Sequence, residues 1–217
     1  MQPLLPSHRR GIDVSRYQGE IGWTAVAANG IRFAFIKASE GIGYADPRLA
    51  ENVAGAARAG IPRSLYHFAR VHNDPQEEAR WFGSIAMYHE TTLPNVLDIE
   101  DARVDSRRLL SPDELVGWVL AWLQEVYAQT GKPCMVYSGA HFINERLAPS
   151  KRSRALQCYP LWVAHYGVTT PLGNPIWDRW SVFQYTSSGL VTGIRGPVDM
   201  NAMEDEGPIC ANGRRGR

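Results

Sequence analysis

The sequence predicts an α/β fold: a single irregular (β/α) TIM-like barrel with eight strands and fewer helices than strands. Short apolar segments alternate with amphipathic helical patterns over the first two thirds of the chain, which implies parallel strands with right-handed crossovers. In the last third, strand-like segments follow one another with only short irregular connections. The length of 217 residues suits one such domain, because single barrels of about 200–250 residues are common.

A doubly wound open sheet is the competing architecture. It would carry a glycine-rich phosphate-binding turn after its first strand, whereas the first turn here reads DVSRYQGE. The barrel is therefore preferred. We expect residues 1–10 to form an N-terminal extension, residues 11–205 the barrel domain and residues 206–217 a C-terminal tail.

The predicted strands are short segments rich in β-branched and aromatic residues, bounded by turn-forming residues. They cover residues 11–15, 32–39, 64–69, 95–100, 133–138, 161–166, 180–186 and 196–200.

Four helices are predicted between the first five strands. The segment WTAVAANG forms the first. Asp46-Pro47, an N-cap followed by Pro at the first helical position, opens the second, which stops at Gly60. Asp74-Pro75 repeats this signal for the third helix, with Glu77 three residues after the cap.

The fourth predicted helix has the strongest pattern. It opens at Ser111-Pro112 with Glu114 placed for a capping box, and Gly131 closes it. Its apolar residues fall on one face: Leu115, Trp118, Val119, Trp122, Leu123 and Val126.

The predicted strand NVLDIE carries two carboxylates, Asp98 and Glu100, inside an apolar run. Side chains alternate across a strand, so the two acids point to one side while Leu97 and Ile99 point to the other. In a barrel, Leu97 and Ile99 would pack under the helices. The acids would face the C-terminal mouth, where barrel enzymes keep their active sites. Burying two acids is unfavourable unless they have partners or a function.

Other predicted strands bring polar groups to the same region. Asp13 and Asp199 lie in the first and last strands, and Lys37 and Glu40 close the second. Taken singly, Asp13 or Asp199 could instead cap a turn, and Glu40 could lie in a surface loop. Together the acids suit glycoside cleavage, which uses paired carboxyl groups. Residues two apart on a strand have Cβ atoms about 6.6 Å apart, which fits both retaining and inverting enzymes.

Aromatic residues strengthen the case for a sugar ligand. Tyr66, Tyr137, Trp162, Tyr166 and Tyr185 lie in or at the ends of predicted strands, although each alone also suits core packing. The candidate substrate-binding residues are Tyr66, Tyr137, Trp162, Tyr166, Lys37, Glu40 and Gln184.

No cofactor or metal site is predicted. Cys134, Cys158 and Cys210 match no zinc spacing, and one disulfide among them stays open. His67 and His165 are expected to be core or supporting groups. With nearby carboxylates they leave a metal-dependent hydrolase as one rival function, which loss of activity with a chelator would favour. A non-catalytic sugar-binding barrel is the other rival, and it would lack one of the paired acids.

The formal net charge of +1 favours neither nucleic acid nor an anionic membrane as a partner. No apolar run approaches the roughly 18–20 residues of a membrane span. The N-terminal segment MQPLLPSHRR lacks the apolar core of a signal peptide.

With these residues in view, the chain resembles glycoside hydrolase family 25, the Chalaropsis-type lysozymes. The matching segments run in family order over roughly residues 11–202: GIDVSRYQGEIGW, FAFIKASEG, SLYHFAR, VLDIE, MVYSG, LWVAHY, VFQYTSSGLVTGI and VDMN. The resemblance implies hydrolysis of the β-1,4 bond between N-acetylmuramic acid and N-acetylglucosamine in bacterial peptidoglycan. It also implies a barrel with fewer helices than strands.

By position, the resemblance makes Glu100 the general acid and Asp98 its partner carboxylate, with Asp13 and Asp199 as two further acids of the groove. It leaves open whether a carboxylate or the substrate's N-acetyl group attacks the sugar carbon. We expect the negative charge of Asp98 to raise the pKa of Glu100 and so keep it protonated.

The resemblance names peptidoglycan glycan strands as the partner of a monomer that acts on the cell wall, outside the cell or in the periplasm. Since no signal peptide is recognisable, phage lysis or a dedicated secretion route would deliver it.

Overall fold

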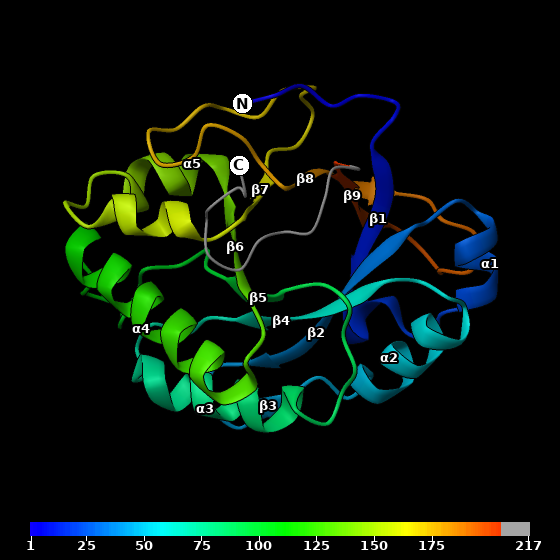
Figure 1. The fold of residues 1–217 in the computed structure, drawn as a ribbon, viewed down its shortest axis with the longest axis horizontal. Coiled ribbons are helices and arrows are strands. Elements are labelled where there is room, and N and C mark those ends of the chain that lie inside the picture. Colours follow the sequence, from blue (N-terminus) through cyan, green and yellow to red (C-terminus); the bar gives the residue numbers. More distant parts are fainter. Residues whose placement is uncertain (205–217) are drawn as a thin grey trace.

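A computed structural model of the chain describes residues 1–204 (Figure 1). The predicted tail at residues 206–217 and Cys210 lie outside this range. Eight strands form the barrel wall: β1 (Arg9–Val14), β2 (Phe33–Glu40), β4 (Arg63–Phe68), β5 (Asn95–Asp98), β6 (Cys134–Gly139), β7 (Leu161–Ala164), β8 (Val182–Gly189) and β9 (Val198–Met203). Pairing of β1 with both β2 and β9 closes the ring. The short β3 (Tyr44–Ala45) pairs with the end of β2.

The helices cover one part of the barrel wall (Figure 1). They are α1 (Trp23–Ala28), α2 (Leu49–Arg58), α3 (Pro75–Ala86), α4 (Pro112–Thr130) and the short α5 (Ala140–Phe142). α2 packs on β2 and β4, α3 on β2 and α4 on β6. Within residues 1–204, no helix separates β7, β8 and β9, so the predicted barrel with fewer helices than strands is confirmed. In the same range, no helix is long and apolar enough to cross a membrane.

The predicted start and end of α4 and the predicted start of α3 are confirmed. Ser111 and Glu114 form the capping box of α4, and Gly131 ends it in the left-handed conformation with φ 63°. The Asp74 carboxylate accepts hydrogen bonds from the backbone N–H groups of Gln76 and Glu77 at the start of α3.

The predicted start of α2 is wrong. The helix begins at Leu49 with Arg48 as its N-cap, two residues after the expected cap. The Asp46 carboxylate instead joins two segments, because it accepts hydrogen bonds from the backbone N–H groups of Arg48, at 2.9 Å, and Arg16, at 3.0 Å. Asp46 thereby ties the start of α2 to the turn that follows β1.

The last strand departs from the parallel arrangement of the other wall strands. β9 is antiparallel to both β8 and β1. Residues 190–197 connect β8 to β9, and a parallel crossover needs about a dozen residues or more, so the chain must turn back. Asp199 therefore reaches the barrel mouth from the start of its strand, while Asp13 reaches it near the end of β1, and the two residues are register partners.

The side-chain alternation predicted for residues 95–100 is confirmed. Val96 belongs to a core inside the barrel, whereas Leu97 and Ile99 belong to the larger core between strands and helices. The inner core fills the barrel with Phe33, Phe35, Val96, Met135, Tyr137, Trp162, Val182 and Met203. Polar groups on the same inner face can therefore gather only at the mouth.

Candidate active site

The four predicted acids converge at this mouth. Asp98 ends β5 and is 7% exposed, and Asp13 near the end of β1 is 8% exposed. Asp199 is half-buried and Glu100 is exposed at the rim. The charges act on one another, because Glu100 raises the pKa of Asp13, Asp98 and Asp199. The structure thus brings together acids from three strands that are far apart in sequence.

Asp98 is the least exposed of these acids. Burial raises its pKa well above the usual range, and the charge of Glu100 raises it further, while Lys37 lowers it. Its Oδ1 is buried and has no hydrogen-bond partner among the described residues. A buried oxygen of this kind is unfavourable in the free protein and is ready to accept a hydrogen bond from a ligand.

Glu100 stands at the exposed end of the pair, yet protein atoms still crowd its carboxyl group. Burial raises its pKa, while the nearby hydroxyl group of Tyr137 and the charge of Lys37 lower it. The charge of Asp98 is not among the causes of this raised pKa, and the expectation that Asp98 raises the pKa of Glu100 stays a prediction. Burial and the charge of Glu100 both raise the pKa of Asp98. We therefore expect the two acids to share one proton in the free protein, held by the more deeply buried Asp98, which as a neutral neighbour would exert no charge on Glu100.

Two amide side chains hold the carboxylate of Asp13. Its Oδ2 accepts hydrogen bonds from Gln184 Nε2 at 2.8 Å and Asn201 Nδ2 at 2.7 Å. Gln184 is 2% exposed and Asn201 is fully buried. Neither amide can rotate without losing a hydrogen bond, so the position of Asp13 is fixed.

Aromatic donors fix the two amides in turn. Gln184 Oε1 accepts hydrogen bonds from the hydroxyl groups of Tyr137 and Tyr166, each at 2.8 Å. Asn201 Oδ1 accepts one from the indole Nε1 of Trp162, also at 2.8 Å. These donors orient the two amides so that the amide nitrogens face Asp13.

Sequence reasoning missed Asn201. It lies two residues after Asp199 and therefore on the same face of β9, which is the alternation that identified the pair Asp98 and Glu100. The segment VDMN contained this signal.

The pKa of Asp13 predicts how stability depends on pH. Burial, reinforced by the charge of Asp199, raises it from 3.8 to about 7. Between these values the folded protein binds a proton that the unfolded chain has released, so stability falls as pH rises and the loss is complete above about pH 7. We expect Asp13→Asn to raise the free energy of unfolding at pH 8 by up to about 4 kcal/mol and to leave it unchanged below pH 4. Urea unfolding at both pH values measures this.

Asp113→Asn is the matched control. Ser150 and the backbone of Lys151 donate hydrogen bonds to Asp113, which lowers its pKa. This substitution should therefore reduce stability above pH 4, the opposite sign. Equal effects of both variants at pH 8 would show that burial of Asp13 does not destabilise the fold.

Lys37 and Glu40 lie beside the acids at the end of β2. Lys37 Nζ donates a hydrogen bond to Glu40 Oε2 at 2.7 Å, and Arg70 Nε donates one to Glu40 Oε1 at 3.0 Å. Both cations lie over the ring of Phe68, whose centroid is 5.0 Å from Lys37 Nζ and 4.8 Å from the guanidinium carbon of Arg70. Lys37 is the cation that acts on both Asp98 and Glu100.

The predicted aromatic contacts differ in how much surface they present. Trp162 is 2% exposed and stacks on Phe35 with ring centroids 4.3 Å apart, so it mainly supports the site. Tyr66 is half-buried and contacts the edge of Trp162. Tyr166 is 48% exposed at the mouth. Tyr185 packs on the outer core and does not face the barrel interior.

The histidines of the metal-dependent rival lie elsewhere. His67 is fully buried behind β4, where its ring nitrogens contact Ser39 Oγ and Glu78 Oε2, each at 2.8 Å. His165 Nδ1 accepts a hydrogen bond from the backbone of Leu172. In residues 1–204 no group of three or more His, Cys, Asp or Glu is arranged to hold a metal ion.

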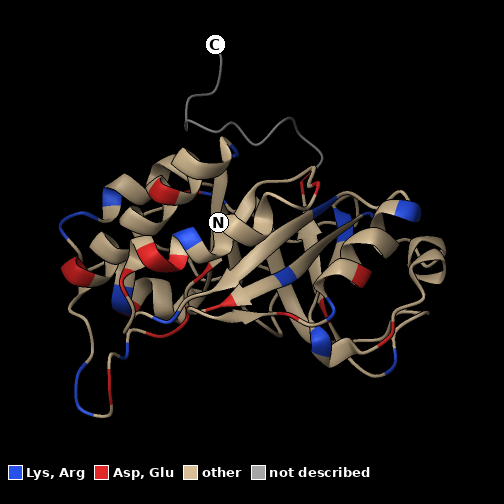
Figure 2. Ribbon diagram, turned by 90° about the horizontal axis from the view of Figure 1, so that it is seen from below, with Lys and Arg blue, Asp and Glu red and all other residues tan. Residues whose placement is uncertain are grey.

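Charged residues elsewhere are mixed in sign. Figure 2 shows Lys and Arg interspersed with Asp and Glu over the ribbon, with no large region of one sign. The acids at the mouth are therefore a local feature.

Comparison with known proteins gives one consistent result. The profile described as Glycosyl hydrolases family 25 matches residues 12–194. Lysozyme M1 of Streptomyces globisporus is 37% identical over 207 residues, covering 92% of this chain and 69% of that protein. The N,O-diacetylmuramidase of Chalaropsis sp is 31% identical over 205 residues, covering 88% and 95%. The crystal structure of the bacterial lysozyme from Streptomyces coelicolor superimposes with a TM-score of 0.82 at 34% identity, covering 92% and 93%.

Proposed function

Because this chain belongs to glycosyl hydrolases family 25, we propose that it cleaves the β-1,4 bond between N-acetylmuramic acid and N-acetylglucosamine, with Glu100 as general acid and Asp98 as the stabilising carboxylate. Its relatives identify the chain as a lysozyme-type glycoside hydrolase of peptidoglycan. The observation that carries the finer proposal is the coupled pair of acids, one buried and one at the rim, at the barrel mouth.

Glu100 is placed for proton transfer to the leaving group. It lies at the exposed end of the pair, where the glycosidic oxygen of a long glycan can reach it. A glycan across the mouth removes water from Glu100 and raises its pKa further, so the protonated form is favoured in the complex. The proton passes to the glycosidic oxygen as the bond to the sugar carbon breaks. The resulting carboxylate then takes a proton from the attacking water.

Asp98 lies deeper, where positive charge develops on the sugar ring. As that charge forms, the ionised state of Asp98 becomes favourable, which reverses its preference in the free protein. Its unpartnered Oδ1 can accept a hydrogen bond from the N–H of the 2-acetamido group. This supports attack on the sugar carbon by the acetamido oxygen, with Asp98 orienting that group. Direct attack by a carboxylate is the other route.

Asp13 and Asp199 add negative charge beside the same carbon. The amides of Gln184 and Asn201 keep Asp13 in place, and Tyr137 and Tyr166 keep Gln184 in place. We propose Tyr66, Tyr166, Lys37 and Glu40 as direct substrate contacts, with Tyr137, Trp162 and Gln184 supporting them from below. A monomer acting on wall glycan outside the cell or in the periplasm suffices for this chemistry.

The cut itself is the first test. Purified peptidoglycan is digested and reduced with borohydride, and the new ends are identified by mass spectrometry. Cleavage after N-acetylmuramic acid should yield muramitol. Glucosaminitol, or free stem peptide with intact glycan, would contradict the proposed bond.

A further inference from the structure

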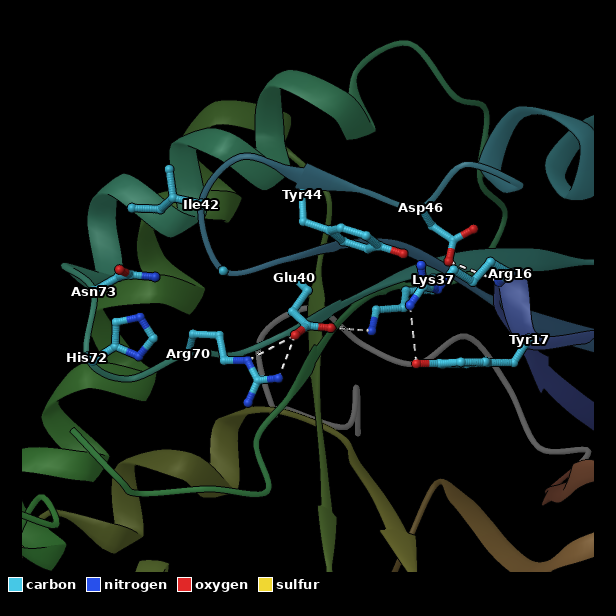
Figure 3. A pocket seen from close by; sticks show the side chains of 11 residues that line it. Arg16, Tyr17, Lys37, Glu40, Ile42, Tyr44, Asp46, Arg70, His72 and Asn73 are labelled. Atoms are coloured by element: carbon cyan, nitrogen blue, oxygen red, sulfur yellow. Dashed lines mark hydrogen bonds and ion pairs between the residues drawn. The ribbon is translucent and has the colours of Figure 1, made fainter. Parts of the chain in front are cut away.

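A cavity of about 450 Å³ opens beside the acids, over the ends of β1, β2 and β4 (Figure 3). Its wall includes Arg16, Tyr17, Lys37, Glu40, Tyr44 and Arg70. We call it the Arg16 pocket. Lys37 belongs to this wall and also acts on the pKa of Asp98 and Glu100, so the pocket and the catalytic centre are neighbours. Its volume lies in the range of about 300–1,000 Å³ typical of ligand pockets.

Two cations and both acids of the wall already have partners. Glu40 is shared between Lys37 and Arg70. The carboxylate of Asp46 is held by the backbone N–H groups of Arg16 and Arg48. Because these charges already interact with one another or with the backbone, they are poorly placed to bind a charged ligand.

Arg16 differs from the other two cations. Its guanidinium carbon lies 5.0 Å from the ring centroid of Tyr17 and 5.8 Å from that of Tyr44. Its Nη2 donates a hydrogen bond to the Tyr17 hydroxyl at 3.4 Å, and Figure 3 shows this pair at the edge of the cavity. Within residues 1–204, no carboxylate forms an ion pair with its guanidinium. Asp46 acts on this cation through space, but its carboxylate accepts hydrogen bonds from backbone N–H groups. The guanidinium of Arg16 is thus an exposed positive charge beside two rings, without a direct ion pair in residues 1–204.

We propose that the Arg16 pocket binds a carboxylate carried by the glycan strand, either the lactyl group of an N-acetylmuramic acid residue or a carboxylate of its stem peptide. The inference rests on the proposed function and adds a specificity site to it. A planar guanidinium pairs with a carboxylate through two parallel hydrogen bonds. Tyr17, which is 77% exposed, offers an apolar ring face to the adjoining sugar. Binding here would fix which sugar lies over Asp98 and Glu100.

The test compares Arg16→Gln with Arg58→Gln on three substrates. Arg58 is an exposed arginine at the end of α2, outside the pocket wall, so its variant makes the same change in net charge. The substrates are glycan strands with stem peptides, strands freed of stems so that the lactyl carboxylate is exposed, and freed strands whose lactyl carboxylates are converted to methylamides.

Arg16→Gln should raise KM by about 3- to 10-fold on a strand that carries the recognised carboxylate, relative to the methylamide strand. Arg58→Gln should give the same ratio as wild type. A raised KM on stem-bearing strands alone identifies the stem peptide as the source of the carboxylate. A raised KM on freed strands identifies the lactyl group as its source. Equal changes on all three substrates, or equal ratios for both variants, would overturn the proposal.

A binding measurement separates this proposal from the proposed function. In ¹⁵N-labelled Glu100→Gln protein, the Arg16 Nε–H signal should shift on titration with a muramic acid tetrasaccharide that has free lactyl carboxylates, or with its stem-bearing form. A chitin tetrasaccharide should not shift it. Absence of the shift with both carboxylate ligands, while wild type cleaves peptidoglycan, would reject only the pocket. A selective shift without cleavage would reject only the proposed function.

Discussion

Glu100→Gln should lower kcat by about 10²- to 10⁴-fold, the usual contribution of a positioned general acid. The amide keeps the shape of the side chain and its ability to hydrogen bond, but it has no proton to donate at working pH. Because Glu100 is exposed, the variant should fold normally. Release of reducing ends from peptidoglycan measures the loss, and circular dichroism with thermal unfolding checks the fold. Near-normal turnover would remove Glu100 as the acid.

The leaving group provides a sharper version of this test. An aryl glycoside expels a weakly basic phenolate, which needs little help from an acid. Glu100→Gln should therefore recover most of its activity on an aryl glycoside of the disaccharide. A better leaving group does not replace a residue that stabilises charge on the sugar ring. The activity of Asp98→Asn should therefore stay low on the same substrate. Recovery of both variants, or of neither, would contradict the two assigned roles.

The sequence predicted the fold well because barrel strands carry strong local signals. Each of the eight wall strands overlaps a predicted segment, and the faces of residues 95–100 follow from alternation alone. The direction of β9 could also have been predicted, since residues 190–197 are too few for a crossover. The start of α2 could not be predicted from local sequence, because Asp46 binds the backbone of Arg16, thirty positions away in the chain.

The positions of the four acids could be predicted from the sequence, but their electrostatics could not. Asp13, Asp98, Glu100 and Asp199 meet at one mouth as expected, yet the main cause of the raised pKa of each is burial. Burial depth is a property of the assembled barrel. The Arg16 pocket also depends on the assembled barrel, because the ends of β1, β2 and β4 and the segments that follow them must come together to form its wall.

Asp98→Asn should lower kcat by about 10²- to 10³-fold, comparable to the removal of one preorganised group that stabilises charge in a transition state. The amide is similar in size to the carboxyl group but cannot become negative as the sugar ring becomes positive. The same variant should be more stable than wild type at pH 8, because it removes a buried acid whose folded pKa is raised. Loss of activity together with gain in stability distinguishes this outcome from misfolding.

The pair must also titrate in a definite order. Burial is the main cause of the raised pKa of both acids, and the charge of Glu100 further raises the pKa of Asp98. We expect Asp98 to hold its proton when Glu100 ionises. Asp98→Asn should therefore leave the midpoint of Glu100 nearly unchanged, since it replaces one neutral neighbour by another. Glu100→Gln should lower the midpoint of Asp98, since it removes a charge. Carboxyl-carbon NMR titrations of the labelled wild type and both variants measure this. A fall of the Glu100 midpoint in Asp98→Asn, with the Asp98 midpoint fixed in Glu100→Gln, would place the shared proton of the free protein on Glu100 instead.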